Sequence, residues 1–285
     1  MGKKNIIIEN KKIGFGNSVF IIAEIGINHN GDMQSAKNLI KSAKDNGASA
    51  IKLQTYITEK RTKSDSPIFK ILKQCELNFH QTKELFDYAR EIDILPFSTP
   101  FDDESVQFLV SINCPVFKIA SFDTVNKSLL RKVAEANKPV IMSTGMTNEK
   151  ELGAAWKSLG GKKDGLGCEL ALLHCVSSYP TPDDEANLSL ISYLNEIHSG
   201  PVGYSDHTIG INIPIMAVAA GAKIIEKHFT LNTSDNGPDH FLSADPSTLK
   251  KMTEGIRKME IILGKNEMRV RDIEKNILQY RRLTD

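Results

Sequence analysis

Eight short apolar segments alternate with longer amphipathic segments along the 285 residues of this chain. The short segments are rich in β-branched residues, whereas the longer ones place apolar residues at helical spacing. Strands are expected at 19–26, 50–56, 94–99, 116–121, 139–145, 170–176, 201–206 and 222–229. Helices are expected at 33–47, 80–92, 103–112, 127–137, 147–159, 187–198, 210–220 and 246–263.

Strands that alternate with helices form a parallel sheet, and eight repeats in about 250 residues favour a closed barrel over an open doubly wound sheet. The predicted fold class is therefore α/β, a (β/α)8 TIM barrel with an N-terminal β-hairpin. One domain is expected over 1–285, with the hairpin in 1–18 covering the bottom of the barrel, the barrel in 19–265 and a helical tail in 266–285. Two long loops, 57–78 and 231–246, are candidates for lids.

The composition excludes several classes of function. The formal net charge of +1 provides no field to attract nucleic acid or an anionic membrane, and no apolar run approaches the 18 residues of a membrane span. The N-terminus lacks the apolar segment of a signal peptide. The four cysteines show no CxxC spacing, so we expect a cytoplasmic protein with reduced core thiols at Cys75, Cys114, Cys168 and Cys175.

Polar side chains stand at the C-terminal end of all eight predicted strands. In a barrel these ends converge on one mouth, where active sites form. Buried charges cost several kcal/mol unless they are paired, so stability alone does not explain the pattern. The polar groups at these ends are Glu24, Lys52, Gln54, Ser98, Thr99, Lys118, Ser121, Ser143, Thr144, His174, Ser177, Ser205, Asp206, His207, Glu226, Lys227 and His228.

These groups suggest two kinds of binding. Lys52 and Lys118, together with the hydroxyls, suit a small dianion such as a phosphate ester. His207 and His228 end adjacent strands and could hold one divalent metal, supported by Glu24 or Asp239. Glu226 shares a strand face with His228, where it could orient a histidine or transfer a proton.

Structural roles compete with these interpretations. Either lysine alone could be an ion-paired structural group, and the Ser and Thr residues could cap the following helices. Lys227 points away from its neighbours by strand alternation, so we expect a supporting or ion-paired role. Among the other histidines, His174 could be a core or a site residue, His80 and His198 are expected to be solvated on helices, and His29 and His240 fall in mouth loops.

A series of motifs, in order, resembles the catalytic barrel of the sialic acid (nonulosonic acid) synthases. They are FIIAEIGINHNGD, AIKLQTY, FSTPFDDESVQFL, FKIAS, KPVIMSTGM, LLHCVSSYPTP, GYSDHTIG, IIEKHFTL and GPDHFLSADP. The resemblance runs from about residue 15 to about residue 282 and implies a condensation of phosphoenolpyruvate with the open-chain aldehyde of an N-acylated hexosamine. It also implies a divalent metal, Mn or Mg, that polarises the aldehyde oxygen. Phosphate leaves, and a nine-carbon 2-keto acid is released.

The resemblance assigns roles to particular positions. His207 and His228 match the metal ligands, and Glu24 and Glu226 match residues at the reacting centre, where Glu24 could handle water or a hydroxyl proton. The positions that match phosphoenolpyruvate contacts are Lys52, Thr99, Lys118, Ser121, Ser143, Ser177 and Ser205. The positions that match sugar contacts are Glu24, Gln54, Asp123, Tyr179 and Asp239.

The chain departs from the family pattern in three places. Ser177 stands where sialic acid synthases usually have Asn, and offers one hydrogen bond in place of the amide's two contacts. Phe122 and Asp123 stand where N-acetylmannosamine-using members tend to have Gly and Glu, and the Phe is similar to members that use 6-deoxy, di-N-acetylated sugars. No antifreeze-like domain follows the barrel in this sequence; in the family that domain covers the partner subunit's mouth, and a homodimer is expected here.

Two alternatives remain open. A related barrel could condense phosphoenolpyruvate with another aldehyde such as a phosphorylated pentose, which needs extra cations that only the EKRTK segment at 59–63 offers. The chain could also be a non-catalytic sugar-binding barrel. Phosphate release in a panel of hexosamines distinguishes these from the nonulosonic acid synthase.

Overall fold

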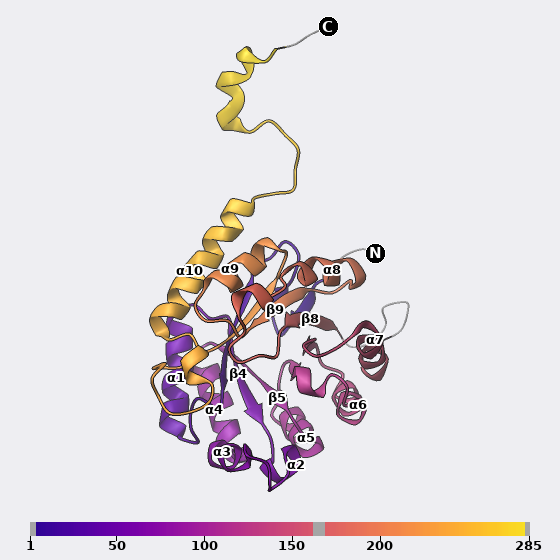
Figure 1. Cartoon of the computed structure of the whole chain (residues 1–285), viewed down its shortest axis with the longest axis vertical. Coiled ribbons are helices and arrows are strands. Elements are labelled where there is room, and N and C mark those ends of the chain that lie inside the picture. Colours follow the sequence, from indigo (N-terminus) through magenta and orange to yellow (C-terminus); the bar gives the residue numbers. More distant parts are fainter. Residues whose placement is uncertain (1–3, 162–168, 283–285) are drawn as a thin grey trace.

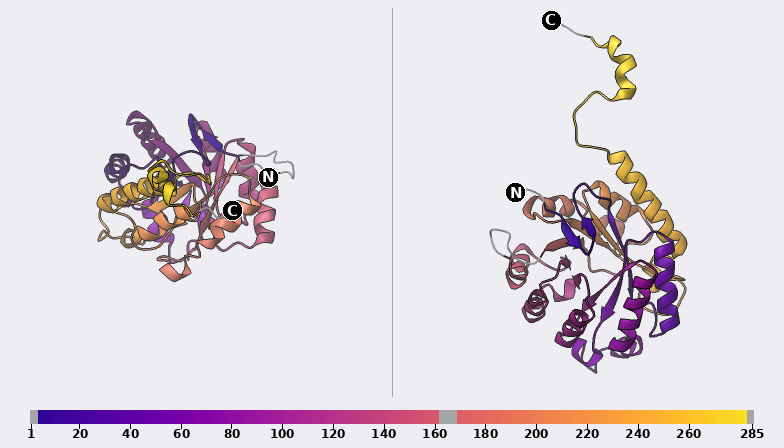
Figure 2. Two further views of the ribbon diagram at one scale, coloured as in Figure 1. Left: turned by 90° about the horizontal axis from the view of Figure 1, so that it is seen from above. Right: turned by 180° about the vertical axis from the view of Figure 1, so that it is seen from behind.

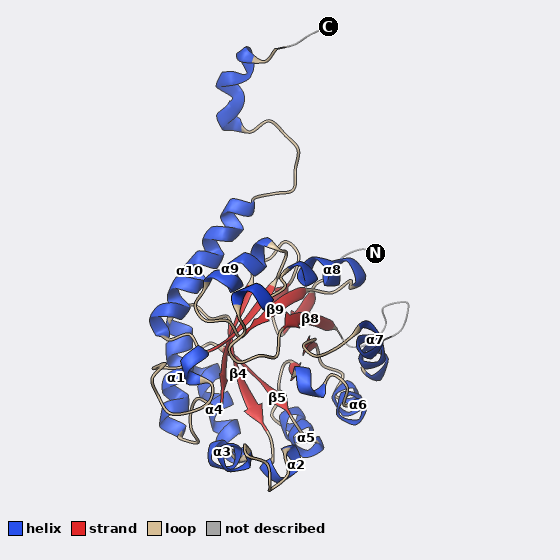
Figure 3. Ribbon diagram, viewed as in Figure 1, coloured by secondary structure: helices blue, strands red, loops and turns tan. Residues whose placement is uncertain are grey.

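Eight parallel strands close into a barrel in the computed structural model, which describes residues 4–161 and 169–282 (Figures 1 and 3). The barrel order is β10-β3-β4-β5-β6-β7-β8-β9, so neighbours in sequence are neighbours in space. The predicted (β/α)8 fold is therefore confirmed. The strands are β3 (Phe20–Gly26), β4 (Ala50–Thr55), β5 (Leu95–Pro100), β6 (Phe117–Ile119), β7 (Val140–Ser143), β8 (Leu170–Cys175), β9 (Val202–Asp206) and β10 (Ile224–His228).

Helices surround the barrel (Figure 3) and bury apolar side chains against it. In α1, for example, Leu39, Ile40 and Ala43 are buried, and the side chain of Asp32 caps the helix by accepting from Ser35 N. The barrel helices are α1 (Met33–Asp45), α4 (Phe79–Glu91), α5 (Asp103–Ser111), α6 (Lys127–Glu135), α7 (Glu149–Ser158), α8 (Ser189–Ile197), α9 (Asn212–Ala219) and α10 (Pro246–Leu263).

The N-terminal hairpin pairs β1 (Ile6–Ile8) with β2 (Lys11–Ile13), as predicted. It covers the end of the barrel at which the strands begin, because its backbone bonds to residues just before two strands. Lys4 N donates to Ser199 O, ahead of β9, and Ile7 N donates to Glu169, ahead of β8. The predicted hairpin at the bottom of the barrel is thus present.

The loop after β4 contains two short helices, α2 (Thr58–Arg61) and α3 (Phe69–Cys75), where the sequence suggested only a long loop. A small apolar cluster separate from the main core holds this segment in place. It consists of Ile27, Tyr56, Leu72 and Cys75, with Phe101 packed against it. This cluster fixes the segment beside the mouth of the barrel.

The other long loop, after β10, carries one turn of 3-10 helix, η3 (His240–Leu242); similar single turns are η1 (Ser121–Asp123) and η2 (Asp183–Glu185). Beyond α10, the C-terminal segment with η4 (Asp272–Tyr280) extends away from the barrel (Figure 1 and the right view of Figure 2). Among the described residues no helix is long and apolar enough to cross a membrane.

Candidate active site

A cavity of about 260 Å³ opens at the C-terminal ends of the barrel strands. Seven of the eight strands contribute a polar side chain that the strand-end pattern predicted, whereas β8 contributes Cys175 in place of the predicted His174 and Ser177. The wall residues on or directly after the strands are Glu24, Lys52, Gln54, Thr99, Lys118, Ser121, Ser143, Cys175, Ser205, His207, Glu226 and His228. Tyr179 and Asp239 join them from loops.

The floor of the cavity is a buried cluster of two lysines and two glutamates. Lys52 Nζ lies 3.2 Å from Glu24 Oε2 and 3.0 Å from Glu226 Oε1. Lys118 Nζ lies 3.8 Å from the same Glu226 oxygen and donates to Ser143 Oγ at 2.6 Å. All four charged side chains are at most 6% exposed. The ion pairs offset the large cost of burying these groups.

Burial and pairing set the protonation of this floor. Burial raises the pKa of Glu24 to about 7, with Lys52 opposing the rise and Glu226 adding to it. For Glu226, burial is outweighed by Lys118 and Lys52, and the pKa falls below its ordinary value. Burial lowers the pKa of Lys118 to about 8, which Glu226 only partly offsets. Near neutral pH the floor thus carries a slight excess of positive charge.

Hydroxyl groups line one side of the lysine pair. Ser205 Oγ donates to Glu226 Oε1 at 3.2 Å, and Ser121 Oγ accepts from Gly145 N at 3.1 Å. Thr99 Oγ1 is buried and has no hydrogen-bond partner in the described part of the chain, so it is available to a ligand. Ser177 is not on the cavity wall, although its Oγ lies 3.9 Å from Cys175 Sγ.

Two imidazoles form the wall above the floor. The rings of His207 and His228 have centroids 5.5 Å apart, and the Tyr179 ring lies 4.1 Å from that of His207. His207 Nδ1 lies 2.8 Å from Val176 O, which can only accept, so Nδ1 carries a proton and Nε2 is the nitrogen that can face a ligand. Burial is outweighed by Cys175 and the Val176 carbonyl, so the pKa of His207 is raised, whereas burial lowers the pKa of His228 well below its ordinary value and keeps that ring neutral.

These groups fit a divalent cation. A carbonyl that orients the far nitrogen of a histidine is the usual support for a metal ligand. His228 Nδ1 and Glu226 Oε2 are buried without a hydrogen-bond partner among the described residues, and Asp239 Oδ2 lies 3.7 Å from His228 Nδ1. No three His, Cys, Asp or Glu side chains of the described chain converge tightly enough to bind a metal alone. Substrate or water oxygens would have to complete the coordination.

Two polar residues on the wall, Arg61 and Cys175, were not among the predicted site residues. Arg61 ends α2 and donates from Nη1 to Gln54 Oε1 at 2.9 Å. Cys175 was expected to be a core thiol, but strand alternation from Leu173 turns it inward, a signal already present in the sequence. Conversely, Asp123 is not on the wall and accepts from Asn126 Nδ2 at 3.0 Å.

Other polar strand-end groups have structural partners. Lys227 Nζ lies 2.5 Å from Asp206 Oδ2 and also donates to Thr208 O, so the predicted ion-paired role is confirmed. His174 Nε2 bonds to Ala186 O at 2.8 Å, away from the cavity. The remaining thiols, Cys75 and Cys114, are buried as predicted, His29 and His240 are buried off the cavity wall, and Cys168 lies outside the described residues.

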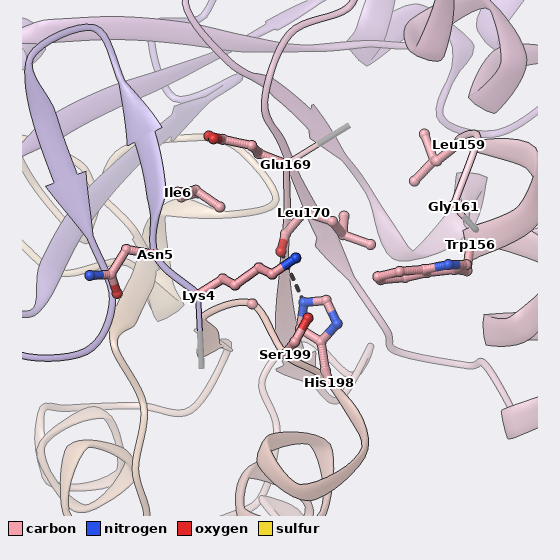
Figure 4. Close-up of a pocket in the computed structure, with 11 residues that line it drawn as sticks. Lys4, Asn5, Ile6, Trp156, Leu159, Gly161, Glu169, Leu170, His198 and Ser199 are labelled. Carbon is pink, nitrogen blue, oxygen red and sulfur yellow. Dashed lines mark hydrogen bonds between the residues drawn. The ribbon is translucent and has the colours of Figure 1, made fainter. Parts of the chain in front are cut away.

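A second cavity, of about 220 Å³, lies at the opposite end of the barrel under the N-terminal hairpin (Figure 4). His198 lies there and is 6% exposed, so the prediction of a solvated helical histidine is wrong. It follows the last residue of α8, where the chain turns inward, and its Nε2 bonds to Leu170 O at 2.9 Å. Glu169 accepts a hydrogen bond from Ile7 N. Both ionisable side chains of this cavity, His198 and Glu169, therefore have structural partners.

Comparisons with known proteins show which family this chain resembles. The model of the NeuB family matches residues 39–268. An uncharacterised protein of Methanocaldococcus jannaschii is 46% identical over 276 residues, covering 96% of this chain and 81% of that protein. The N,N'-diacetyllegionaminic acid synthase of Campylobacter jejuni is 40% identical over 261 residues, covering 86% and 77%.

A solved structure shows the same architecture. The N-acetylneuraminic acid (sialic acid) synthetase of Leptospira borgpetersenii, crystallised with citrate, superposes with a TM-score of 0.93 at 38% identity, covering 98% of this chain and 96% of that one. The match extends through the barrel strands that carry the cavity wall. The resemblance drawn from the sequence motifs is therefore confirmed, and the chain belongs to the NeuB family, whose characterised relatives include nonulosonic acid synthases.

Proposed function

We propose that this protein is a nonulosonic acid synthase that condenses phosphoenolpyruvate with the open-chain form of an N-acyl hexosamine, either N-acetylmannosamine or a 6-deoxy di-N-acetylated sugar. The observation that carries the proposal is the convergence of a lysine pair, a glutamate pair and an imidazole pair on one cavity. The names of the relatives support the product class. The reaction transfers a three-carbon unit and releases phosphate, so the enzyme is a transferase.

Phosphoenolpyruvate is assigned to the floor. Its carboxylate and phosphate need several donors at close range, and Lys52, Lys118 and the hydroxyls of Ser143 and Ser205 supply them within one buried cluster. Charge-assisted hydrogen bonds in such a desolvated site are stronger than at the surface. Thr99, Ser121 and Ser177 are proposed to complete the set.

The aldehyde is assigned to the space beside the imidazoles. His207 and His228 would hold a Mn or Mg ion, which when bound would polarise a carbonyl oxygen. The His228 ring favours its neutral form, and at His207 a cation would take the place on Nε2 of the proton that the raised pKa of that ring favours. Gln54, Tyr179 and Asp239 lie on the wall toward the mouth, where they would orient the sugar hydroxyls. A substrate held between floor and mouth places the aldehyde carbon near C3 of phosphoenolpyruvate.

The two glutamates are suited to proton transfer because their pKa values differ. Glu226 is ionised between the lysines, whereas Glu24 titrates near neutral pH. A group with a pKa near the working pH both accepts and returns a proton efficiently. We therefore assign Glu24 to the water or hydroxyl proton and Glu226 to charge stabilisation next to the aldehyde.

The test is phosphate release from phosphoenolpyruvate with Mn²⁺ and a panel of hexosamines, with mass spectrometry of the product. We expect release only with an N-acyl hexosamine, loss of activity on chelation and recovery on adding Mn²⁺. His207→Ala and His228→Ala should each reduce kcat/KM by at least a hundredfold, because each removes one of two proposed protein ligands.

His80→Ala is the matched control, since His80 is an exposed helical histidine outside the cavity. Full activity in either cavity variant would refute the metal assignment. Sugar binding without phosphate release in the wild type would favour the non-catalytic barrel.

A further inference from the structure

Arg61 occupies an unusual position for a cation at the mouth of the cavity. Its Cζ lies 3.7 Å from the centroid of the Phe101 ring and 4.5 Å from that of the Tyr56 ring. These rings are nearly perpendicular, at 83°. Aromatic faces hold a guanidinium by cation–π attraction while leaving its in-plane N–H donors free. The side chain is therefore fixed in place without a carboxylate partner.

The donors of Arg61 are only partly used. Nη1 donates to Gln54 Oε1, and within the described chain no Asp or Glu oxygen lies within 4.0 Å of the guanidinium. Other cations of the same segment are engaged elsewhere: Lys60 pairs with Glu104, and Lys73 pairs with Glu59 and Glu76. Of the three cations Lys60, Arg61 and Lys73, Arg61 is the one that lines the cavity. Its remaining N–H groups are available to a ligand.

Arg61 lies on the mouth side of the lysine pair, separated from it by a chain of polar contacts. Arg61 bonds to Gln54, Gln54 Nε2 donates to Glu24 Oε1 at 2.9 Å, and Glu24 pairs with Lys52. A ligand group at Arg61 therefore belongs to the part of the sugar remote from the aldehyde. The cavity wall at this end is also apolar, formed by Ile68, Leu72 and Phe101.

The surroundings favour a neutral ligand group over an anion. Asp123, Glu24 and Asp239 all act electrostatically on Arg61, and Glu24 and Asp239 line the same cavity. A phosphate dianion here would be attracted by one cation and repelled by the neighbouring carboxylates. A neutral acylamido group meets no such repulsion, and its methyl can contact the apolar wall while its carbonyl accepts from the guanidinium.

Building on the proposed function, we propose that Arg61 and the wall of Ile68, Leu72 and Phe101 form a subsite for an acylamido substituent of the sugar remote from its aldehyde. The guanidinium donates to the acyl oxygen, and the wall contacts the acyl methyl. This subsite selects a di-N-acylated 6-deoxy hexose over a mono-N-acylated hexose and over a sugar phosphate. No covalent step is involved.

The experiment measures KM and kcat for three sugars: a 2,4-diacetamido-6-deoxyhexose, N-acetylmannosamine and N-acetylmannosamine 6-phosphate. The variants are Arg61→Gln, which keeps a neutral donor, and Arg61→Lys, which keeps the charge but loses the planar fork. Lys63→Gln is the control, because Lys63 is exposed in the same segment and off the wall. Circular dichroism and phosphoenolpyruvate binding by calorimetry verify that each variant is folded with an intact floor.

We expect the wild type to prefer the diacetamido sugar. Both Arg61 variants should raise its KM at least tenfold, with kcat within about twofold, because a hydrogen bond to a charged donor is lost in binding. The KM for N-acetylmannosamine should change less than threefold, and Arg61→Lys should be no better than Arg61→Gln.

Three results would overturn the subsite. One is a wild-type preference for the sugar phosphate that Arg61→Lys keeps and Arg61→Gln loses, which would mean that Arg61 binds an anion. The second is an equal loss for all sugars, and the third is an unchanged KM in both variants. Failure of the proposed function looks different: the wild type would release phosphate with none of the three sugars, and the subsite would fall with it.

Discussion

We predict that the charged Lys118 at the cavity floor lowers the free energy of unfolding of the protein. The variant Lys118→Met, which removes the charge, tests this prediction. Burial lowers its pKa from 10.5 to about 8. At about 1.4 kcal/mol per pKa unit, holding the charged form makes the folded protein roughly 3 kcal/mol less stable at pH 7. Methionine removes that penalty but also the bonds to Ser143 Oγ and Ile119 O, worth about 1 kcal/mol each, while Glu226 keeps its closer partner Lys52. The net gain is about 1 kcal/mol.

The gain must depend on pH in a particular direction. Between pH 8 and 10.5 the unfolded chain holds a proton on Lys118 that the folded chain has released, so wild-type stability rises with pH in this window. The variant has no such group. By pH 10 the wild-type penalty falls below about 1 kcal/mol, which is less than the lost hydrogen bonds contribute, so the variant should no longer be the more stable protein.

Urea unfolding at pH 7 and pH 10 measures the effect, with far-UV circular dichroism and the fluorescence of Trp156, the one tryptophan of the chain, as probes. Phosphoenolpyruvate turnover should be lost in the same variant, since polar sites commonly trade stability for function. A variant less stable than the wild type at pH 7, or a gain that persists unchanged at pH 10, would refute the reasoning.

Three further predictions follow from other contacts. Lys227→Met should lower the free energy of unfolding by about 3–5 kcal/mol in urea titration, because it leaves a buried carboxylate unpaired; an unchanged urea midpoint would contradict this. Gly145→Ala places a Cβ 2.5 Å from Ser177 Oγ and should raise the KM for phosphoenolpyruvate about tenfold, whereas Gly153→Ala, with open space around it, should not. Wild-type stability should fall from pH 5 to pH 7, because folded Glu24 keeps a proton that the unfolded chain releases, and Glu24→Gln should flatten that slope in urea unfolding at each pH.

The barrel and most of its site could be predicted because strand geometry is local. Alternation decides which side chains face inward, and closure brings all eight strand ends together. Lys52 and Lys118 were thus predicted to converge from two strands, and both lie at the floor beside Glu226. Lys227 was predicted to face away by the same alternation, and its buried partner confirms this.

Features that depend on distant packing could not be predicted in this way. The segment that carries Arg61 has no regular periodicity, and it is placed by a separate apolar cluster that joins residues from three parts of the chain. His198 looked solvated because it ends an amphipathic helix, but the neighbouring strand residue Leu170 supplies an inward hydrogen-bond acceptor. Asp123 was assigned by resemblance alone, and a local bond to Asn126 holds it off the cavity wall.

The three consecutive ionisable residues of β10 have different functions because alternation divides them between two environments. Glu226 and His228 face the cavity, whereas Lys227 faces outward and is paired in register with Asp206 of β9. β9 shows the same alternation: Asp206 faces outward, and His207, the next residue, faces the cavity. The buried ion pair therefore joins the two strands at the level of the two imidazoles. It fixes the register of β9 and β10 from outside the barrel, and that register determines the separation of the proposed metal ligands inside it.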